Sequence, residues 1–281
     1  MDADSRLRAL DALEALPDRR SGWPGRIWSA TWPALAAAAL AVGLWELVVL
    51  SGWKDPWVLP GPGEVLPRLW RDLTDPGFWA GLGSTMRRAA GGFALSIGAG
   101  IVLAVIAIRP RPLRIAVGSL ITGLQTMPAI AWFPLAILLF KLSESAILFV
   151  IVLGAAPSIA NGLISGIDHT PPALLRAGQV LGIRGVSWYV HLLLPAALPA
   201  FVTGLKQGWA FAWRGLMAGE LLVIIGNHPS LGVRLDFARQ TSDSVEMLAT
   251  MIVIMAIGIL VDRLFSAADH TLRTRRGLIA R

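Results

Sequence analysis

The sequence predicts an all-α polytopic membrane protein with about six transmembrane helices. Hydrophobic residues make up 55% of the 281 residues and charged residues only 15%, whereas an ordinary soluble domain carries about 25% charged residues. The mean hydropathy is +0.63, and several apolar runs approach or exceed the ~20 residues that cross a bilayer. We expect helices for these runs, because lipid offers no hydrogen-bond partners to an open strand.

The transmembrane domain is expected over residues 31–266, between a charged N-terminal segment (1–30) and a basic tail (267–281). The six predicted spans are residues 31–50, 89–108, 115–140, 145–166, 195–225 and 246–266. The connection between the first two carries WKDPWVLPGPGEVLPRLWRDL, whose tryptophans suit a helix that lies in the membrane interface. The N-terminal segment lacks the basic-then-apolar order of a signal peptide, so we expect it to stay in the cytosol.

The distribution of lysine and arginine predicts that both termini are cytoplasmic. With that topology, 15 of the 25 basic residues fall on the cytoplasmic side and 8 on the other side, as the positive-inside rule requires. The connection 51–88, with five of those eight, is the main exception. The net charge of +7 therefore indicates cytoplasmic loops and a bilayer partner rather than a nucleic acid, and the absence of cysteine excludes disulfides and thiolate metal sites.

A polar, glycine-rich stretch, LRAGQVLGIRGVSWYVHLLLP at 175–195, lies between two apolar spans. Thr170 followed by two prolines is a good helix start, and Gly182 can supply the left-handed residue that ends a helix. After a turn near Gly185, a second helix is expected to begin around Ser187 and enter the membrane. The result is a short cytoplasmic helix joined rigidly to a span, within a loop of about 168–190. It suits transmission of motion from a soluble partner, although an ordinary interfacial loop would have the same pattern.

This stretch resembles the signature loop of ABC importer permeases: Glu-Ala-Ala, three residues, Gly, nine residues, Ile-x-Leu-Pro. Here it reads Arg176-Ala177-Gly178, then QVL, Gly182, then IRGVSWYVH, and LLLP ending at Pro195. Arginine replaces the family's glutamate and Gly178 replaces its second alanine. An acidic contact to the ATPase therefore does not carry over, and Arg176 is expected to meet an acidic partner surface instead.

The resemblance covers roughly residues 55 to 278 and points to the branch that imports sulfonates, taurine, nitrate or bicarbonate. LPGPGEVLPRLW, LQTMPAIAWFPLAILLF, GLKQGWAFAWRGLMAGELL and ILVDRLF carry it in order. It implies the ABC permease fold in a bacterial inner membrane, with two copies (a homodimer or a close paralogue) and two ATP-binding subunits. An extracytoplasmic binding protein delivers substrate, and ATP and Mg are bound by the partner ATPase, none by this chain. The residues implied in ATPase coupling are Arg176, Ala177, Gly178, Gly182, Ile183, Arg184 and Pro195.

The fifth span carries the most informative candidates for a translocation pathway. One helical face is expected to present a stripe of five side chains, namely Lys206, Trp209, Trp213, Met217 and Glu220. Gln207 and Arg214 flank that stripe. Ionisable groups in a membrane normally face a cavity or a partner, so the two cations would suit an anion. Alternatively, Arg214 and Glu220 pair structurally with other helices, with Glu46 as one possible partner for Arg214, or Lys206 reaches toward the cytosol.

The third span adds Gln125, Met127 and Trp132 as pathway candidates. Pro128 is expected to kink this span, since it removes a backbone hydrogen bond, and freed carbonyls inside a membrane usually line a cavity. Met127 and Trp132 would form an apolar gate or simply pack. Two pairs of glycines four apart in the fifth span are expected to serve close helix packing, within the chain or at a dimer seam.

The sequence favours transport over catalysis. It lacks GxxxxGK[ST], the loop that cradles phosphates, and its four histidines form neither HExxH nor part of a matched serine nucleophile motif. No catalytic residue or metal site is expected. A secondary transporter would predict inverted repeats and paired broken helices, which we do not find. We expect a small anion as substrate, an aliphatic sulfonate or taurine first, with nitrate, bicarbonate or a pyrimidine or aromatic compound as alternatives.

Overall fold

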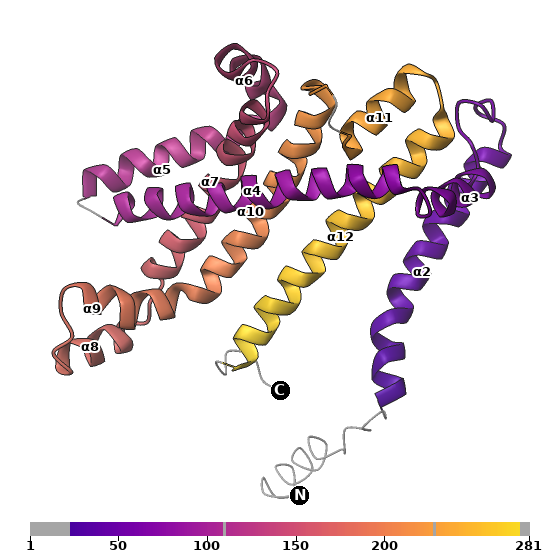
Figure 1. Cartoon of the computed structure of the whole chain (residues 1–281). Helices are drawn as coiled ribbons and strands as arrows, with labels where there is room; N and C mark the ends of the chain where they lie inside the picture. Colours follow the sequence, from indigo (N-terminus) through magenta and orange to yellow (C-terminus); the bar gives the residue numbers. More distant parts are fainter. Residues whose placement is uncertain (1–22, 109–110, 227–228, 276–281) are drawn as a thin grey trace, which may run out of the picture. The chain divides into compact units, whose positions relative to one another are not determined.

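The computed structural model describes residues 23–108, 111–226 and 229–275, and every element in these ranges is a helix (Figure 1). Five helices are long and apolar enough to cross a membrane, or six if one sharply bent pair counts as a single span. The predicted all-α fold with about six spans is confirmed. The chain divides into two compact units, residues 1–62 and 63–281, which are described separately below.

The first unit consists of helix α2 (Trp23–Leu50) and the loop that follows it. Its apolar stretch, Trp32–Leu50, matches the predicted first span. The loop folds back on the helix, because the Trp45 Nε1–H donates a hydrogen bond of 3.1 Å to the carbonyl of Pro60. Most of the N-terminal segment, residues 1–22, lies outside the described residues.

The second unit is built around helix α7 (Glu144–Asp168), which packs between α4 (Pro76–Ala107) and α10 (Leu194–Leu222). The predicted spans 145–166 and 195–225 match α7 and α10, whereas the prediction of 89 as the start of the second span is wrong. Helix α4 begins at Pro76 because the Asp75 carboxylate caps it, accepting hydrogen bonds from the backbone N–H groups of Gly77 and Phe78.

Glycine permits the close approach of α7 and α10. A Cβ atom added to Gly162 on α7 would lie 2.6 Å from the Cα atom of Gly204, and one added to Gly208 would lie 2.6 Å from Ile159. Gly204 and Gly208, the first of the two glycine pairs predicted to serve close helix packing, therefore pack against α7 within one subunit.

The third predicted span is broken rather than kinked. Helices α5 (Arg111–Thr126) and α6 (Phe133–Phe140) are separated by the 3₁₀ turn η1 (Ala129–Trp132). The helix direction bends by 101° between Pro112–Thr126 and Ala129–Phe140. The break lies at Pro128, where the kink was predicted. A second proline, Pro134, sits in the first turn of α6 and can only begin a helix there.

The interrupted stretch folds as the sequence predicted, except at its start. Helix α8 (Pro172–Val180) ends before Gly182, which has a φ of +68°, and Gly185 has a φ of +62°. Helix α9 (Val186–Trp188) and the π-helix η2 (Tyr189–Leu193) then lead directly into α10. The prediction that Thr170 caps α8 is wrong: the cap residue is Pro171, and the Thr170 hydroxyl donates backward to the Gly166 carbonyl.

Three further helices complete the second unit. Helix α3 (Pro62–Asp72) lies within the connection 51–88, α11 (Leu231–Gln240) was not predicted, and α12 (Ser244–Arg275) contains the sixth span and extends into the predicted tail. An ion cluster joins them: Arg234 of α11 pairs with Asp72 of α3 and Glu246 of α12. Burial alone would lower the pKa of Arg234, but the hydrogen bond and charge of Glu246, together with Asp72, raise that pKa above its ordinary value.

Gly162→Ala should destabilise the second unit, because the added methyl group would collide with the backbone of α10. Overpacking of this kind costs about 1–3 kcal/mol. The matched control is Gly98→Ala on α4, where an added Cβ meets nothing within 4 Å. Thermal unfolding of the purified protein in detergent should show a lower midpoint for Gly162→Ala only. Equal midpoints would contradict the assignment of this contact as a tight one.

Candidate functional site

A cavity of about 420 Å³ lies where α5 breaks, against α7 and α10. It brings together four predicted pathway residues from two separate spans, namely Gln125, Met127, Trp132 and Arg214. Pro128 opens this space by ending α5, and Phe211 of α10 completes the wall. The cavity combines an apolar lining with one cation and one amide, as small-molecule sites commonly do.

Arg214 is a cation without a compensating carboxylate in this cavity. Its side chain is exposed, and its guanidinium lies 5.6 Å from the centre of the Phe211 ring. Within residues 23–108, 111–226 and 229–275 it makes no ion pair. Gln125 is oriented by a 3.0 Å hydrogen bond from its Nε2 to the Ser158 hydroxyl. A positive charge on an apolar span, fixed beside a cavity, is suited to attract an anion.

The aromatic part of the predicted stripe faces the interior of the chain's own helix bundle. Trp209 and Trp213 are buried and stacked, with ring centres 6.0 Å apart, and Phe93 of α4 meets Trp209 edge-on at 5.3 Å. Met217 packs against the same cluster. Their role in transport stays a prediction, and their positions are those of core residues.

Glu220 forms a buried ion pair that ties four helices together. It is 0% exposed, and its carboxylate accepts hydrogen bonds from Thr85 Oγ1 at 2.9 Å, Arg88 Nη1 at 3.0 Å and the Gly232 N–H at 3.0 Å. Arg88 also bonds Glu144 at the start of α7, at 3.2 Å. Structural pairing of Glu220 is one of the alternatives that the sequence leaves open, and the structure shows such a pair. Its partner could not be predicted, because Arg88 precedes residue 89, where the second span was expected to begin.

Lys206, the last member of the stripe, is also compensated. Its Nζ lies 3.3 Å from Asp262 Oδ1 and donates to the Ser266 hydroxyl at 2.8 Å, both on α12. The two basic residues of the fifth span thus differ: Lys206 is paired within the chain, whereas Arg214 lines the cavity.

The second candidate site is the element formed by α8, α9 and η2. Gly178 is buried, and a Cβ atom there would lie 2.6 Å from Leu192 and 2.9 Å from the Trp188 ring. The absence of a side chain at Gly178 lets Leu192 and the Trp188 ring pack directly on α8, and an alanine there would require both to shift. Helix α8 is therefore fixed to the helical segment that continues into α10, whose second residue is Pro195.

The outer surface of this element combines exposed apolar side chains with two exposed arginines. Val180 at the end of α8, Leu181 after it and Val186 at the start of the run Val186–Leu222 are 88%, 74% and 77% exposed. Arg176, Ala177 and Arg184 are exposed around them, and Ile183 is half-buried. Clustered exposed apolar side chains beside charged ones mark a surface for contact with a protein or with the membrane.

A bundle of apolar helices of membrane-spanning length, with a cavity lined by a cation, is an arrangement typical of a membrane transport subunit. The family model for the inner membrane component of binding-protein-dependent transport systems matches residues 96–274. The chain belongs to this family, and the resemblance to ABC importer permeases of the sulfonate and nitrate branch is confirmed.

Several curated relatives align over most of their length. A putative ABC transporter permease of Methanocaldococcus jannaschii is 30% identical, over 82% of this chain and 86% of that protein. The putative aliphatic sulfonates transport permease SsuC of Bacillus subtilis is 27% identical, over 85% and 86%. The nitrate import permease NrtB of a Synechocystis strain is 27% identical, over 82% and 85%.

Solved structures show the same fold. A chain of a bacterial alginate ABC transporter aligns with a TM-score of 0.57 at 14% identity, over 89% of this chain and 98% of that one. A chain of an amino acid ABC transporter aligns with a TM-score of 0.56 at 17% identity, over 71% and 94%.

Glu220→Gln should strongly destabilise the permease, because it leaves the buried Arg88 with only its half-exposed partner Glu144. Breaking a buried pair costs about 3–5 kcal/mol. The control, Asp262→Asn, breaks the exposed pair with Lys206 and should cost about 0–1 kcal/mol. Unfolding midpoints in detergent and the yield of folded protein in membranes measure both, and similar losses for the two variants would contradict the assigned difference.

Proposed function

We propose that this permease subunit imports a small organic anion, an aliphatic sulfonate or taurine, and that Arg214 binds the anionic group on its way through. The observation that carries the proposal is the uncompensated guanidinium at the wall of the 420 Å³ cavity. Met127, Trp132 and Phe211 line the same cavity and suit the carbon part of such a substrate. The relatives named for aliphatic sulfonate transport support this substrate class.

Nitrate is the second candidate substrate. A nitrate import permease is as similar to this chain as the sulfonate permease of Bacillus subtilis, at 27% identity. Nitrate would use the same arginine but has no carbon chain to contact the apolar wall. The lining of the cavity therefore favours the organic anion.

The energy for import would come from a separate ATPase. Two copies of this chain would assemble with two ATP-binding subunits, which hold ATP and Mg, and a binding protein would deliver the substrate from outside. The element α8–α9–η2 would lie in the cytosol as the coupling helix, with both termini on that side. Arg114 pairs with Asp168 just before α8, so the loop after α4 lies at the same end, as the distribution of basic residues predicts.

The structure offers a direct mechanical route for coupling. Residues Val186–Leu222 form one continuous helical run, which begins at the contact surface beside α8 and carries Arg214 within the membrane. Movement of α8 when the ATPases close would therefore shift the wall of the cavity. Alternating access follows when this movement exposes Arg214 first to one side of the membrane and then to the other.

Arg214→Ala should reduce uptake of an alkanesulfonate at least tenfold, because the anion would lose its only fixed counter-charge in the cavity. Growth on that sulfonate as sole sulfur source and uptake of the labelled compound measure the effect. Arg214→Lys should restore part of the uptake, and Lys206→Ala, which removes a compensated cation, should change it little. Wild-type uptake by Arg214→Ala would overturn the role of this residue, and uptake of nitrate alone would favour the second substrate.

Leu181→Glu should weaken retention of the ATPase subunit by the tagged permease at least tenfold, because it places a carboxylate at the centre of the exposed apolar surface. Leu181→Met keeps that surface apolar and serves as the control. Co-purification of the two subunits and ATP hydrolysis by the reconstituted complex are the measurements. Undiminished co-purification of Leu181→Glu would show that the ATPase docks elsewhere.

A further inference from the structure

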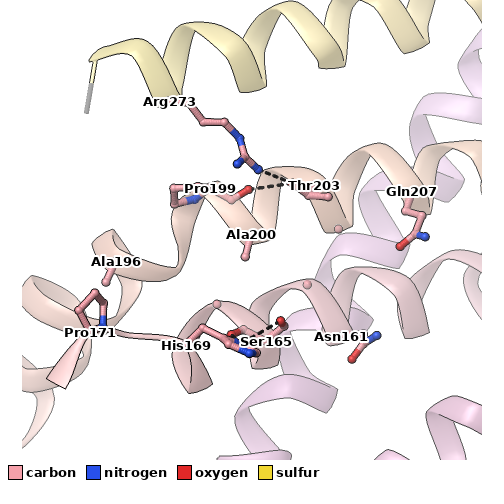
Figure 2. A pocket seen from close by; sticks show the side chains of 13 residues that line it. Asn161, Ser165, His169, Pro171, Ala196, Pro199, Ala200, Thr203, Gln207 and Arg273 are labelled. Carbon is pink, nitrogen blue, oxygen red and sulfur yellow. Dashed lines mark hydrogen bonds between the residues drawn. The ribbon is translucent and has the colours of Figure 1, made fainter. Parts of the chain in front are cut away.

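A second cavity of about 600 Å³ lies between α7 and α10, nearer to α8 (Figure 2). Its polar lining comes from both helices and from the end of α12, namely Asn161, Ser165, His169, Thr203, Gln207 and Arg273. Of these residues, only Gln207 was considered in the sequence analysis, as a neighbour of the predicted stripe in the fifth span. No role in transport was predicted for the other five.

The two cavities lie along one face of the helix pair. On α10, Thr203, Gln207, Phe211 and Arg214 follow one another at intervals of four, four and three residues, so they share a helical face. The first two line the 600 Å³ cavity and the last two line the 420 Å³ cavity. The face opposite to the core stripe of Trp209 and Trp213 is therefore a polar seam that runs from Arg214 toward α8.

The amide side chains of this seam are exposed and have no partner within the chain. Asn161 and Gln207 make no side-chain hydrogen bond among the residues that the structure describes, and in Figure 2 both project away from their ribbons. An amide without a partner costs several kcal/mol in hydrocarbon. The exposed face of α4, by contrast, is apolar, with Leu95, Val102 and Ile106. The seam is thus built to contact water or a polar solute, not lipid.

The charges along the seam suit release of an anion rather than tight binding. Arg214 stands at one end without a carboxylate, whereas Arg273 at the other end bonds Asp269 at 2.8 Å and Thr203 at 3.2 Å. Between them lie the neutral amides of Asn161 and Gln207. Binding weak enough to let a solute leave is a requirement of conduction.

From this geometry we propose that the polar seam is the exit half of the translocation pathway, with the amides of Asn161 and Gln207 donating hydrogen bonds to the anion after it leaves Arg214 and Thr203 lining the same path. The proposal rests on the proposed function, since it takes the same anion from the same cavity. It assigns specific residues to the part of the pathway that faces the ATPases.

The chain contains no cysteine, so single-cysteine variants carry a unique thiol. Thr203→Cys, Gln207→Cys and Asn161→Cys should react with a sulfonate-bearing methanethiosulfonate in inside-out vesicles at least tenfold faster than the control Val102→Cys. Modification should block uptake, and a saturating alkanesulfonate should slow it. Thr203→Cys is nearly isosteric, so it keeps the test available if Asn161→Cys fails to fold.

Three results would overturn the seam as a pathway. Reaction no faster than that of Val102→Cys would mean that the face contacts lipid. Disulfide formation between two copies without reaction with the anionic reagent would mean that it is a packed dimer contact. Reaction that leaves uptake unchanged would mean that the seam is wet but not used. Uptake by the cysteine-free wild type, measured separately, distinguishes failure of the seam from failure of the proposed substrate.

Discussion

The close approach of α7 to α10 positions everything else in the second unit. Gly162 and Gly204 bring the two backbones into direct contact. Both cavities open along this pair of helices, and the helix that carries Arg214 starts at the contact surface beside α8. The crossing therefore positions the side chains that line both cavities.

Pairing within the chain distinguishes two of the charged residues of α10, Glu220 and Lys206, from the third, Arg214. Glu220 and Arg88 pair in a buried site between four helices, and Lys206 is matched by Asp262 at the bundle surface. Arg214 is the charged residue of α10 for which the described residues provide no ion-pair partner. In a membrane protein a fixed cation of this kind must be matched by a solute, a second subunit or water, and its place beside Gln125 and Phe211 favours a solute.

Much of the fold could be predicted from the sequence, because apolar length determines where spans lie and prolines and glycines determine where they break. Pro128 and Gly182 are at the expected breaks. The sequence alone does not predict which face of α10 is buried. Trp209 and Gln207 lie on opposite faces of the helix, and both faces carry apolar and polar residues. Four of the predicted pathway residues do meet in one cavity. The pairing of Glu220 with Arg88 could not be predicted, because it requires α4 to begin at Pro76, and the Asp75 cap that begins it there is a weak signal in a single sequence.

The π-helix η2 determines more than the local path of the chain. Relative to an α-helix, a wider turn of this kind accommodates one additional residue, and each residue of an α-helix corresponds to about 100° of rotation. The direction in which every side chain of α10 points about the helix axis therefore depends on Tyr189–Leu193. One additional residue in this turn would be enough to rotate side chains that face the helix bundle, such as Trp209, away from it, and to bring side chains that face away from it, such as Gln207, toward it.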